Sequence, residues 1–204
     1  MSKNYFHRFL IMLVSGLVIG IGVFFSVSAN VGTDPLTTFQ QGLSNALGLE
    51  LAICSFLSNL LFAFFIFVVD RKALKITDIV YPFIISAGIK LASYIPLPLH
   101  SMVLRVLYFV IALVLIGFGI GLGVNSKCGN NPYDGFVLLI SKKINKQFKH
   151  MRMLLDITVL VIGIILKGNF GVGTILSMGL QGTIGQFFIE FLEKSDFLHK
   201  YTAD

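Results

Sequence analysis

The sequence predicts an all-α polytopic membrane protein, with six transmembrane helices arranged as two inverted three-helix repeats. Only 13% of the residues are charged and 55% are hydrophobic, with a mean hydropathy of +0.86, whereas soluble domains carry about 25% charged residues. Apolar runs long enough to cross a bilayer recur along the chain, and its two halves match at a single offset. This composition excludes a water-soluble single-core domain, a disordered chain and a disulfide scaffold.

The six apolar runs cover residues 9–29, 51–69, 76–98, 106–126, 153–166 and 172–189. The fifth run rises only about 21 Å as a helix, which is short against a hydrocarbon core of about 30 Å. We therefore expect this span to be distorted, shielded by its neighbours, or helped by its flanking residues Arg152 and Lys167, whose side chains can snorkel. The first run also has features of a signal peptide, but its length and its counterpart in the second half favour a retained span.

Basic residues predict the orientation of the spans. The segment 30–50 contains no Lys or Arg, whereas its counterpart 127–147 carries Lys142, Lys143 and Lys146. Basic residues concentrate on the cytoplasmic side of a membrane protein. We therefore expect both termini to be cytoplasmic, and we attribute the net charge of +6 to topology rather than to nucleic-acid binding.

An internal repeat predicts the domain organisation. At an offset of 97 residues, Gly32 meets Gly129, Pro35 meets Pro132 and Thr77 meets Thr174, without a gap. The chain is then a single membrane domain, 1–204, with one repeat over about 1–97, a second over about 98–194, and a cytoplasmic tail over 195–204. Three spans per half give the halves opposite orientations, as in many secondary transporters and some channels. A duplicated scaffold without transport activity is the alternative.

Glycines at helical spacing predict close packing of the first and fourth spans. Gly16-x-x-x-Gly20 lies in the first, and Gly117-x-x-x-Gly121 and Gly119-x-x-x-Gly123 lie in the fourth. Small residues at this spacing let helix backbones approach each other. The same packing role is expected for Gly179, Gly182 and Gly185 in the last span.

The matched Gly–Pro motifs predict a short helix after the first span of each half, over 35–47 and 132–145. In each, a glycine allows a sharp turn, Asp34 or Asn131 can cap, and Pro35 or Pro132 suits the first helical position. Two interpretations remain open. In the first, both helices lie in the membrane interfaces. In the second, their N-terminal amides point into a polar cavity.

A glycine-rich first span leading to G-x-D-P, with G-x-N-P-Y-D-G-F about a hundred residues later, is similar to the YczE/YitT group of bacterial integral membrane proteins. The similarity covers nearly the whole chain, and Tyr133 stands where that group leads us to expect a basic residue. It implies a multi-pass protein of the bacterial plasma membrane, of a kind often described as a permease.

Ionisable residues inside apolar runs are candidates for function. Lys90 falls in the outer half of its run, where Asp34 can reach it if the first motif dips inward, while snorkelling to the headgroups is the alternative. Asp156 lies near the inner edge, at the wrong depth for Lys90, and Arg152 or Lys127 suits it better. We therefore expect Asp34 and Lys90 to meet.

These residues favour a transporter, either a secondary carrier or a channel, for a small polar or anionic solute. The candidate binding residues are Asp34, Pro35, Lys90, Asn131, Pro132 and Asp134, with Asp156 as a secondary candidate. No catalytic motif, metal site or cofactor motif is present in the sequence, so we expect no enzymatic activity. The expected partners are the lipid bilayer, the solute, and a second copy or another membrane protein. The alternative is a non-transporting membrane factor whose basic segment 142–152 contacts a partner protein or anionic lipid.

Overall fold

The computed structural model describes residues 3–98 and 100–194, and over these residues the regular structure is entirely helical. The predicted tail, 195–204, lies outside the described residues. The helices are α1 (Lys3–Ala29), α2 (Pro35–Leu47), α3 (Leu51–Val69), α4 (Ile76–Ala92), α5 (Met102–Ser126), α6 (Pro132–Lys143), α7 (Phe148–Ile165) and α8 (Val172–Glu193).

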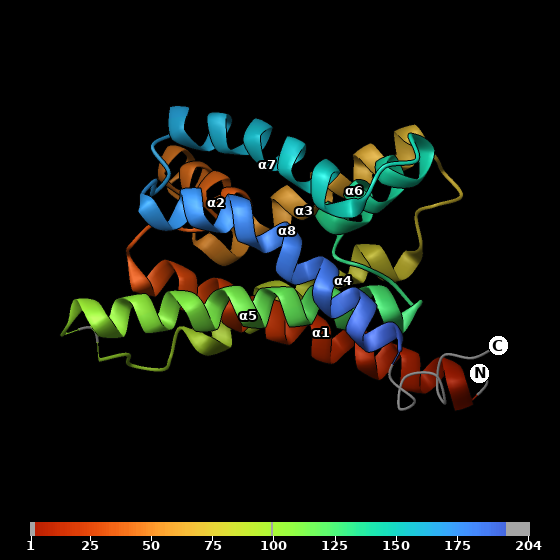
Figure 1. Ribbon diagram of the computed structural model, residues 1–204, viewed down its shortest axis with the longest axis horizontal. Helices are drawn as coiled ribbons and strands as arrows, with labels where there is room; N and C mark the ends of the chain where they lie inside the picture. The colour runs from red at the N-terminus through yellow and green to blue at the C-terminus, as the bar shows by residue number, and fades with distance from the viewer. Residues whose placement is uncertain (1–2, 99, 195–204) are drawn as a thin grey trace.

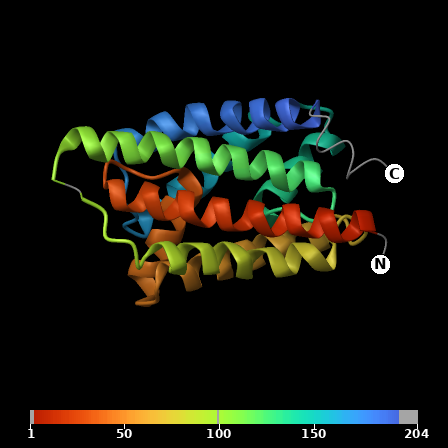
Figure 2. The same ribbon diagram turned by 90° about the horizontal axis from the view of Figure 1, so that it is seen from below.

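The helices form two layers (Figure 1). The long helices α4, α1, α5 and α8 lie side by side in that order in one layer, and α2, α3, α6 and α7 form the other (Figures 1 and 2). Helices α1 and α4 run in one direction and α5 and α8 in the other, so the start of α1 and the end of α8 lie at the same end (Figure 2). The shorter helices α2 and α6 lie toward opposite ends of the second layer (Figure 1).

The predicted close packing of the first and fourth spans is confirmed in α1 and α5, but mostly through other glycines than expected. The glycines at 16 and 20 face α4, and those at 117 and 121 face α8. A Cβ atom on Gly22 would lie 2.8 Å from the side chain of Ile116, and one on Gly119 would lie 2.5 Å from that of Ile19. The hydroxyl of Ser15 donates to the Gly119 carbonyl at 2.6 Å across the same contact. Helix α1 therefore packs closely within the layer of long helices.

A second close contact joins α1 to α4. A Cβ atom on Gly20 would lie 2.4 Å from the Ile85 carbonyl oxygen and 2.8 Å from Cα of Gly88. Gly179 in α8 differs, because no atom lies within 4 Å of the position its Cβ would take. The expected packing role of Gly179 was therefore wrong, since that side of α8 has no neighbouring helix.

Local signals set the limits of the motif helices. Helix α2 has the predicted limits, because Asp34 Oδ1 accepts from Thr37 N–H at 3.2 Å and Gly48, at φ +67°, closes the C-terminus. Helix α6 ends two residues earlier than expected, where Asn145 adopts φ +51° and Lys146 N–H donates to the Ser141 carbonyl.

The helix of the fifth apolar run begins earlier than predicted. Helix α7 starts at Phe148 rather than at residue 153. Arg152 is thereby placed inside the helix and is only 2% exposed. It does not snorkel to an interface as a flanking residue would.

The outer surface has the character of a membrane protein. Among the described residues, four helices are long and apolar enough to cross a bilayer: α1, α3, α5 and α8. Helix α4 has only 17 residues, and α7 carries Lys149, Arg152 and Asp156. Large apolar side chains are exposed along most helices, among them Phe64, Phe83 and Val161. A surface of this kind needs lipid rather than water.

Candidate functional site

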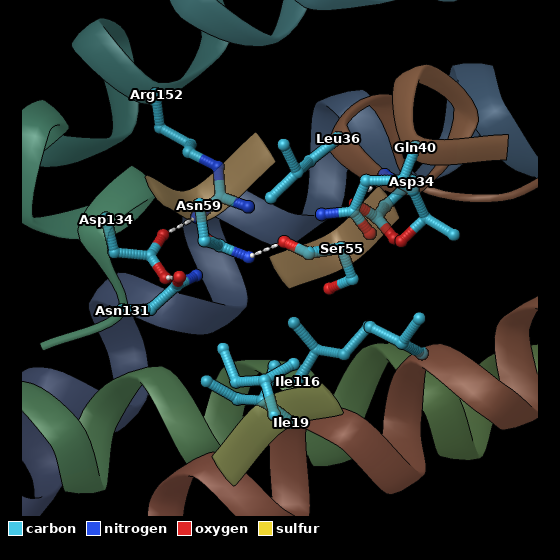
Figure 3. Close-up of a pocket in the computed structure, with 13 residues that line it drawn as sticks. Ile19, Asp34, Leu36, Gln40, Ser55, Asn59, Ile116, Asn131, Asp134 and Arg152 are labelled. Carbon is cyan, nitrogen blue, oxygen red and sulfur yellow. Dashed lines mark hydrogen bonds and ion pairs between the residues drawn. The ribbon is translucent and has the colours of Figure 1, made fainter. Parts of the chain in front are cut away.

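A small cavity lies between the two layers, where both Gly–Pro motifs meet α3 and α7 (Figure 3). Its volume is ≈ 20 Å³, which is room for about one water molecule. It is lined by Ile19, Val23, Asp34, Leu36, Thr37, Gln40, Ser55, Asn59, Ile85, Ile116, Asn131, Asp134 and Arg152. The long helices supply an apolar floor, and the second layer supplies the polar groups.

The motif helices bring their first turns to this cavity. Asp34 and Asn131, the N-cap residues of α2 and α6, are 4% and 6% exposed. Pro35 and Pro132 are buried in the first helical positions, whereas the C-terminal ends of both helices are exposed. Of the two interpretations, this burial favours N-termini that point into a cavity.

A buried ionic cluster forms one side of the cavity. Arg152 contacts Asp134 through Nη1, and its Nε donates to Asp156 Oδ1 at 3.1 Å. The hydroxyl of Tyr133 donates to the same Asp156 oxygen at 2.5 Å, and the guanidinium carbon lies 4.7 Å from the centre of the Tyr133 ring. The suggestion that Arg152 suits Asp156 is thus confirmed, and the aromatic ring covers the ion pair.

Five oxygen atoms of cavity-lining residues have no hydrogen-bond partner: Asp34 Oδ2, Gln40 Oε1, Ser55 Oγ, Asn59 Oδ1 and Asn131 Oδ1. Buried polar groups are nearly always paired, because an unpaired one loses its water without compensation. Five such atoms around one cavity therefore indicate a place where a ligand or water is held.

The orientations of the three amides follow from their partners. Asn59 Nδ2 donates to the Ser55 carbonyl at 2.9 Å, and Asn131 Nδ2 donates to Asp134 Oδ2 at 2.8 Å (Figure 3). Gln40 Nε2 donates at 3.0 Å to Ser58 Oγ, whose own hydrogen goes to the Ser55 carbonyl. Since these partners accept, each nitrogen is fixed and each unpaired amide atom is an oxygen.

The charges around the cavity do not balance. Asp34, Asp134 and Asp156 carry three carboxylates, and Arg152 is the one basic residue among the described residues that line the cavity or contact this cluster. If all are ionised, the region carries two formal negative charges in excess. The site therefore favours positive charge over negative charge.

Residues that line the cavity occur in pairs 97 positions apart. The pairs are Ile19 with Ile116, Asp34 with Asn131, Thr37 with Asp134, and Ser55 with Arg152. Asn59, on the lining, likewise corresponds to Asp156 in the ionic cluster. The two halves thus contribute equivalent positions. The second half carries the charge at three of them, Asp134, Arg152 and Asp156, whereas the first half carries it at Asp34.

The predicted pairing of Asp34 with Lys90 was wrong. Lys90 Nζ contacts Glu50 Oε2 at 2.7 Å, and the two side chains are 47% and 61% exposed. Lys90 does not line the cavity, because α4 presents this residue to the surface near the start of α3. The first motif does dip inward and bring Asp34 to the cavity, but the pairing fails because Lys90 lies on the surface-facing side of α4.

Sequence reasoning missed Arg152, Ser55 and Asn59 as site residues. The 97-residue offset carries the signal that would have found them, since Ser55 and Asn59 correspond to Arg152 and Asp156.

Two surface hollows are lined by residues that neighbour the cavity wall in sequence. One, of ≈ 520 Å³, includes Asn30, Gln41 and Lys167, and Gln41 is the neighbour of Gln40. The other, of ≈ 540 Å³, includes Asn130 and Gly135, which flank the segment Asn131–Asp134.

Comparison with known proteins gives one family and three relatives. Residues 6–190 match a family of unknown function, DUF6198. YyaS of Bacillus subtilis, an uncharacterized protein, is 28% identical over 181 residues, which cover 87% of this chain and 90% of YyaS. An uncharacterized Haemophilus influenzae protein is 24% identical over 184 residues, which cover 90% of this chain and 84% of the Haemophilus protein. YczE of Bacillus subtilis, an uncharacterized membrane protein, is 26% identical over 172 residues, 84% of this chain and 80% of YczE.

No solved structure matches the chain. The similarity expected from the G-x-D-P and G-x-N-P-Y-D-G-F motifs is confirmed, because YczE is among the relatives and the matched region contains both motifs. A helical chain with four helices apolar enough to cross a bilayer agrees with the membrane character of YczE. The protein belongs to DUF6198 and is a YczE-like membrane protein.

Proposed function

We propose that this protein is a membrane transporter, rather than an enzyme, and that a small polar solute passes through the buried cavity. The observation that carries the proposal is the set of five unpartnered oxygens around a cavity inside a lipid-facing helical protein. Polar and ionisable groups at such a depth are costly, and they typically mark the path of a substrate or ion. A purely structural core gains nothing from leaving them unpaired.

The two hollows support a path with access from both sides. One hollow is lined by Gln41 and the other by Asn130, and each of these residues is next in sequence to a residue of the cavity wall. Thr33 Oγ1 donates to Gln41 Oε1 at 3.3 Å, and Asp78 accepts from Asn130 N–H at 2.7 Å. In this proposal these two polar contacts close the approaches to the cavity. Alternate opening of these contacts would expose the cavity first to one side and then to the other.

We further propose six spans in two inverted halves in the plasma membrane, with both termini cytoplasmic. Reciprocal contacts support the repeat: a Cβ on Gly32 would meet Thr174, and one on Gly129 would meet Thr77. The two glycines are 97 residues apart, and so are the two threonines. Left-handed backbone also recurs at this offset, at Asn30 and Lys127 and at Gly48 and Asn145. Helices α4 and α7 would then cross while shielded by their neighbours.

The cavity favours a neutral or positively charged solute over the anionic alternative. Its unpartnered atoms accept hydrogen bonds, and carboxylates outnumber the single guanidinium. The Asp34 carboxylate alone would repel an anion, and this repulsion is strong in a region of low dielectric constant. Amines and other hydrogen-bond donors fit this wall better.

Uptake into liposomes tests the proposal. The purified chain is reconstituted, a sodium or proton gradient is imposed, and a panel of radiolabelled amines, amino acids, sugars and carboxylates is offered. At least one solute is expected to accumulate above the level of protein-free liposomes. Asp34→Asn should lower its initial rate by about tenfold or more, because it removes a buried charge but keeps a capping oxygen.

Glu50→Gln is the matched control, because Glu50 is an exposed carboxylate in a surface pair and should change uptake little. If folded wild-type protein accumulates none of the panel, or if Asp34→Asn and wild type transport equally, the proposed route through the cavity is wrong.

A second candidate is a non-transporting factor that binds anionic lipid or a partner protein. It is favoured by the basic hollow beside α6, which includes Lys72, Lys75, Lys142 and Lys143. Arg152, expected in this basic surface, is instead buried in the ionic cluster. This role leaves the unpartnered oxygens of the cavity without a purpose, so transport remains the better-supported function.

A further inference from the structure

The free atoms of the cavity form a set of ligands made only of oxygen. They comprise three amide oxygens, one hydroxyl and one carboxylate oxygen, from Gln40, Asn59, Asn131, Ser55 and Asp34. Each of the five residues is at most 6% exposed, and all of them line the same cavity (Figure 3). Carboxylate, carbonyl and hydroxyl oxygens are the ligands that hard cations select. The chemistry of the wall thus points to a cation.

The surrounding charges agree with this sign. Asp134 and Asp156 both form ion pairs with the guanidinium of Arg152. Asp34 lies near enough to Arg152 for an electrostatic attraction but forms no ion pair with it among the described residues. Asp34 Oδ1 accepts from the Thr37 amide, so Oδ2 is the oxygen that remains for a ligand. A cation beside Oδ2 would offset this carboxylate in a region of low dielectric constant.

Size and ligand charge define the class of cation. A volume of ≈ 20 Å³ admits a single water-sized occupant and excludes choline or an amino acid in this conformation. The described residues contain no group of three or more His, Cys, Asp and Glu side chains that could hold a metal ion, which disfavours a transition metal. One carboxylate among four neutral oxygens suits a single positive charge better than a double one.

From these observations we infer that the cavity is a binding site for a small monovalent cation, with Asp34 as its charged ligand. Its role as the coupling ion, or as the transported ion, rests on the proposed transport function. Binding itself does not, because it is measurable without a membrane gradient. Ser55, Gln40, Asn59 and Asn131 complete the site as neutral ligands.

Equilibrium binding of radioactive sodium to the purified full-length chain in detergent, with choline chloride holding the ionic strength constant, tests this inference. Saturable binding is expected, with competition by unlabelled sodium and lithium and none by choline. Asp34→Asn should weaken the affinity by about tenfold or more, while Glu50→Gln, the exposed matched carboxylate, should leave it unchanged.

Ser55→Ala separates a ligand from a structural residue. The Ser55 hydroxyl has no partner within the protein, so its removal should leave the thermal stability in choline unchanged or raise it. The same variant should lower sodium affinity and reduce the stabilisation that sodium gives to wild type. A merely structural serine would show neither effect.

Absence of saturable sodium binding by folded wild type would overturn the inference and leave water as the occupant. Equal binding by wild type and Asp34→Asn would overturn it as well. Sodium binding without uptake of any solute would support the site and count against the transport proposal. Uptake without sodium binding would support the transport proposal and count against the cation site.

Discussion

Arg152→Met is expected to destabilise the protein by about 3–5 kcal/mol, because it leaves two buried carboxylates without their cation. Asp134 and Asp156 are 2% and 0% exposed, and both contact this guanidinium. Thermal unfolding of the full chain in detergent measures the effect. Lys149→Met is the matched control, since Lys149 lies on the same helix one turn earlier and is exposed.

Neutralising the carboxylates as well should restore much of this loss. In the triple variant Arg152→Met, Asp134→Asn, Asp156→Asn, no buried charge of the cluster remains, and the Tyr133 hydroxyl can still donate to an amide oxygen. We expect the triple variant to be more stable than Arg152→Met alone. Equal or greater instability of the triple variant would show that the cluster does not stabilise the fold through charge balance.

Gly20→Leu is expected to destabilise the protein by about 3 kcal/mol or more. This is at or above the largest loss of stability usually caused by overpacking a core. Its Cβ alone would lie 2.4 Å from the Ile85 carbonyl oxygen and 2.8 Å from Cα of Gly88, so the backbones of α1 and α4 would have to separate. The higher helix propensity of Leu returns only about 1 kcal/mol. Folded yield and the midpoint of thermal unfolding in detergent measure the change.

Gly179→Leu provides the comparison. Gly179 is also a glycine within an apolar helix, but its Cβ position has no atom within 4 Å. The Gly179→Leu substitution should leave the thermal stability unchanged or raise it slightly. Similar losses for Gly20→Leu and Gly179→Leu would mean that helix flexibility, rather than the α1–α4 contact, sets the requirement for glycine.

Much of the fold could be predicted because its signals are local. Asp34 and Gly48 set the limits of α2 through a side-chain cap and a positive φ, and both effects are visible in the residues themselves. The α1–α5 contact followed from small residues that let backbones approach. Helix ends were less certain where apolarity was the guide, as for α7, whose first turn is too polar for an apolar run.

The site could be predicted only in part, because depth along a helix does not say which way a loop bends. Asp34, Asn131 and Asp134 were identified from the motifs and do line the cavity. Lys90 was assigned to the site by its depth, but it faces the surface and pairs with Glu50. Arg152 was named as a partner for Asp156 but not counted as a site residue, because its position at the edge of an apolar run resembles that of a snorkelling residue.

The side of the membrane reached by each motif helix tests the central claim, that two oppositely oriented halves enclose one site. Single cysteines replace Ala46, in the exposed last turn of α2, and Lys146, in the loop after α6. The buried Cys54 and Cys128 are first changed to Ala. These exposed positions are preferable to Asn45, whose side chain donates to the Lys167 carbonyl, and to Asn145, which has a positive φ.

A membrane-impermeant thiol reagent is applied to intact cells and to inverted vesicles. The Ala46→Cys chain is expected to react only in intact cells, and the Lys146→Cys chain only in inverted vesicles. Reaction of both cysteines from the same side would contradict the inverted arrangement and, with it, a cavity reached from opposite faces.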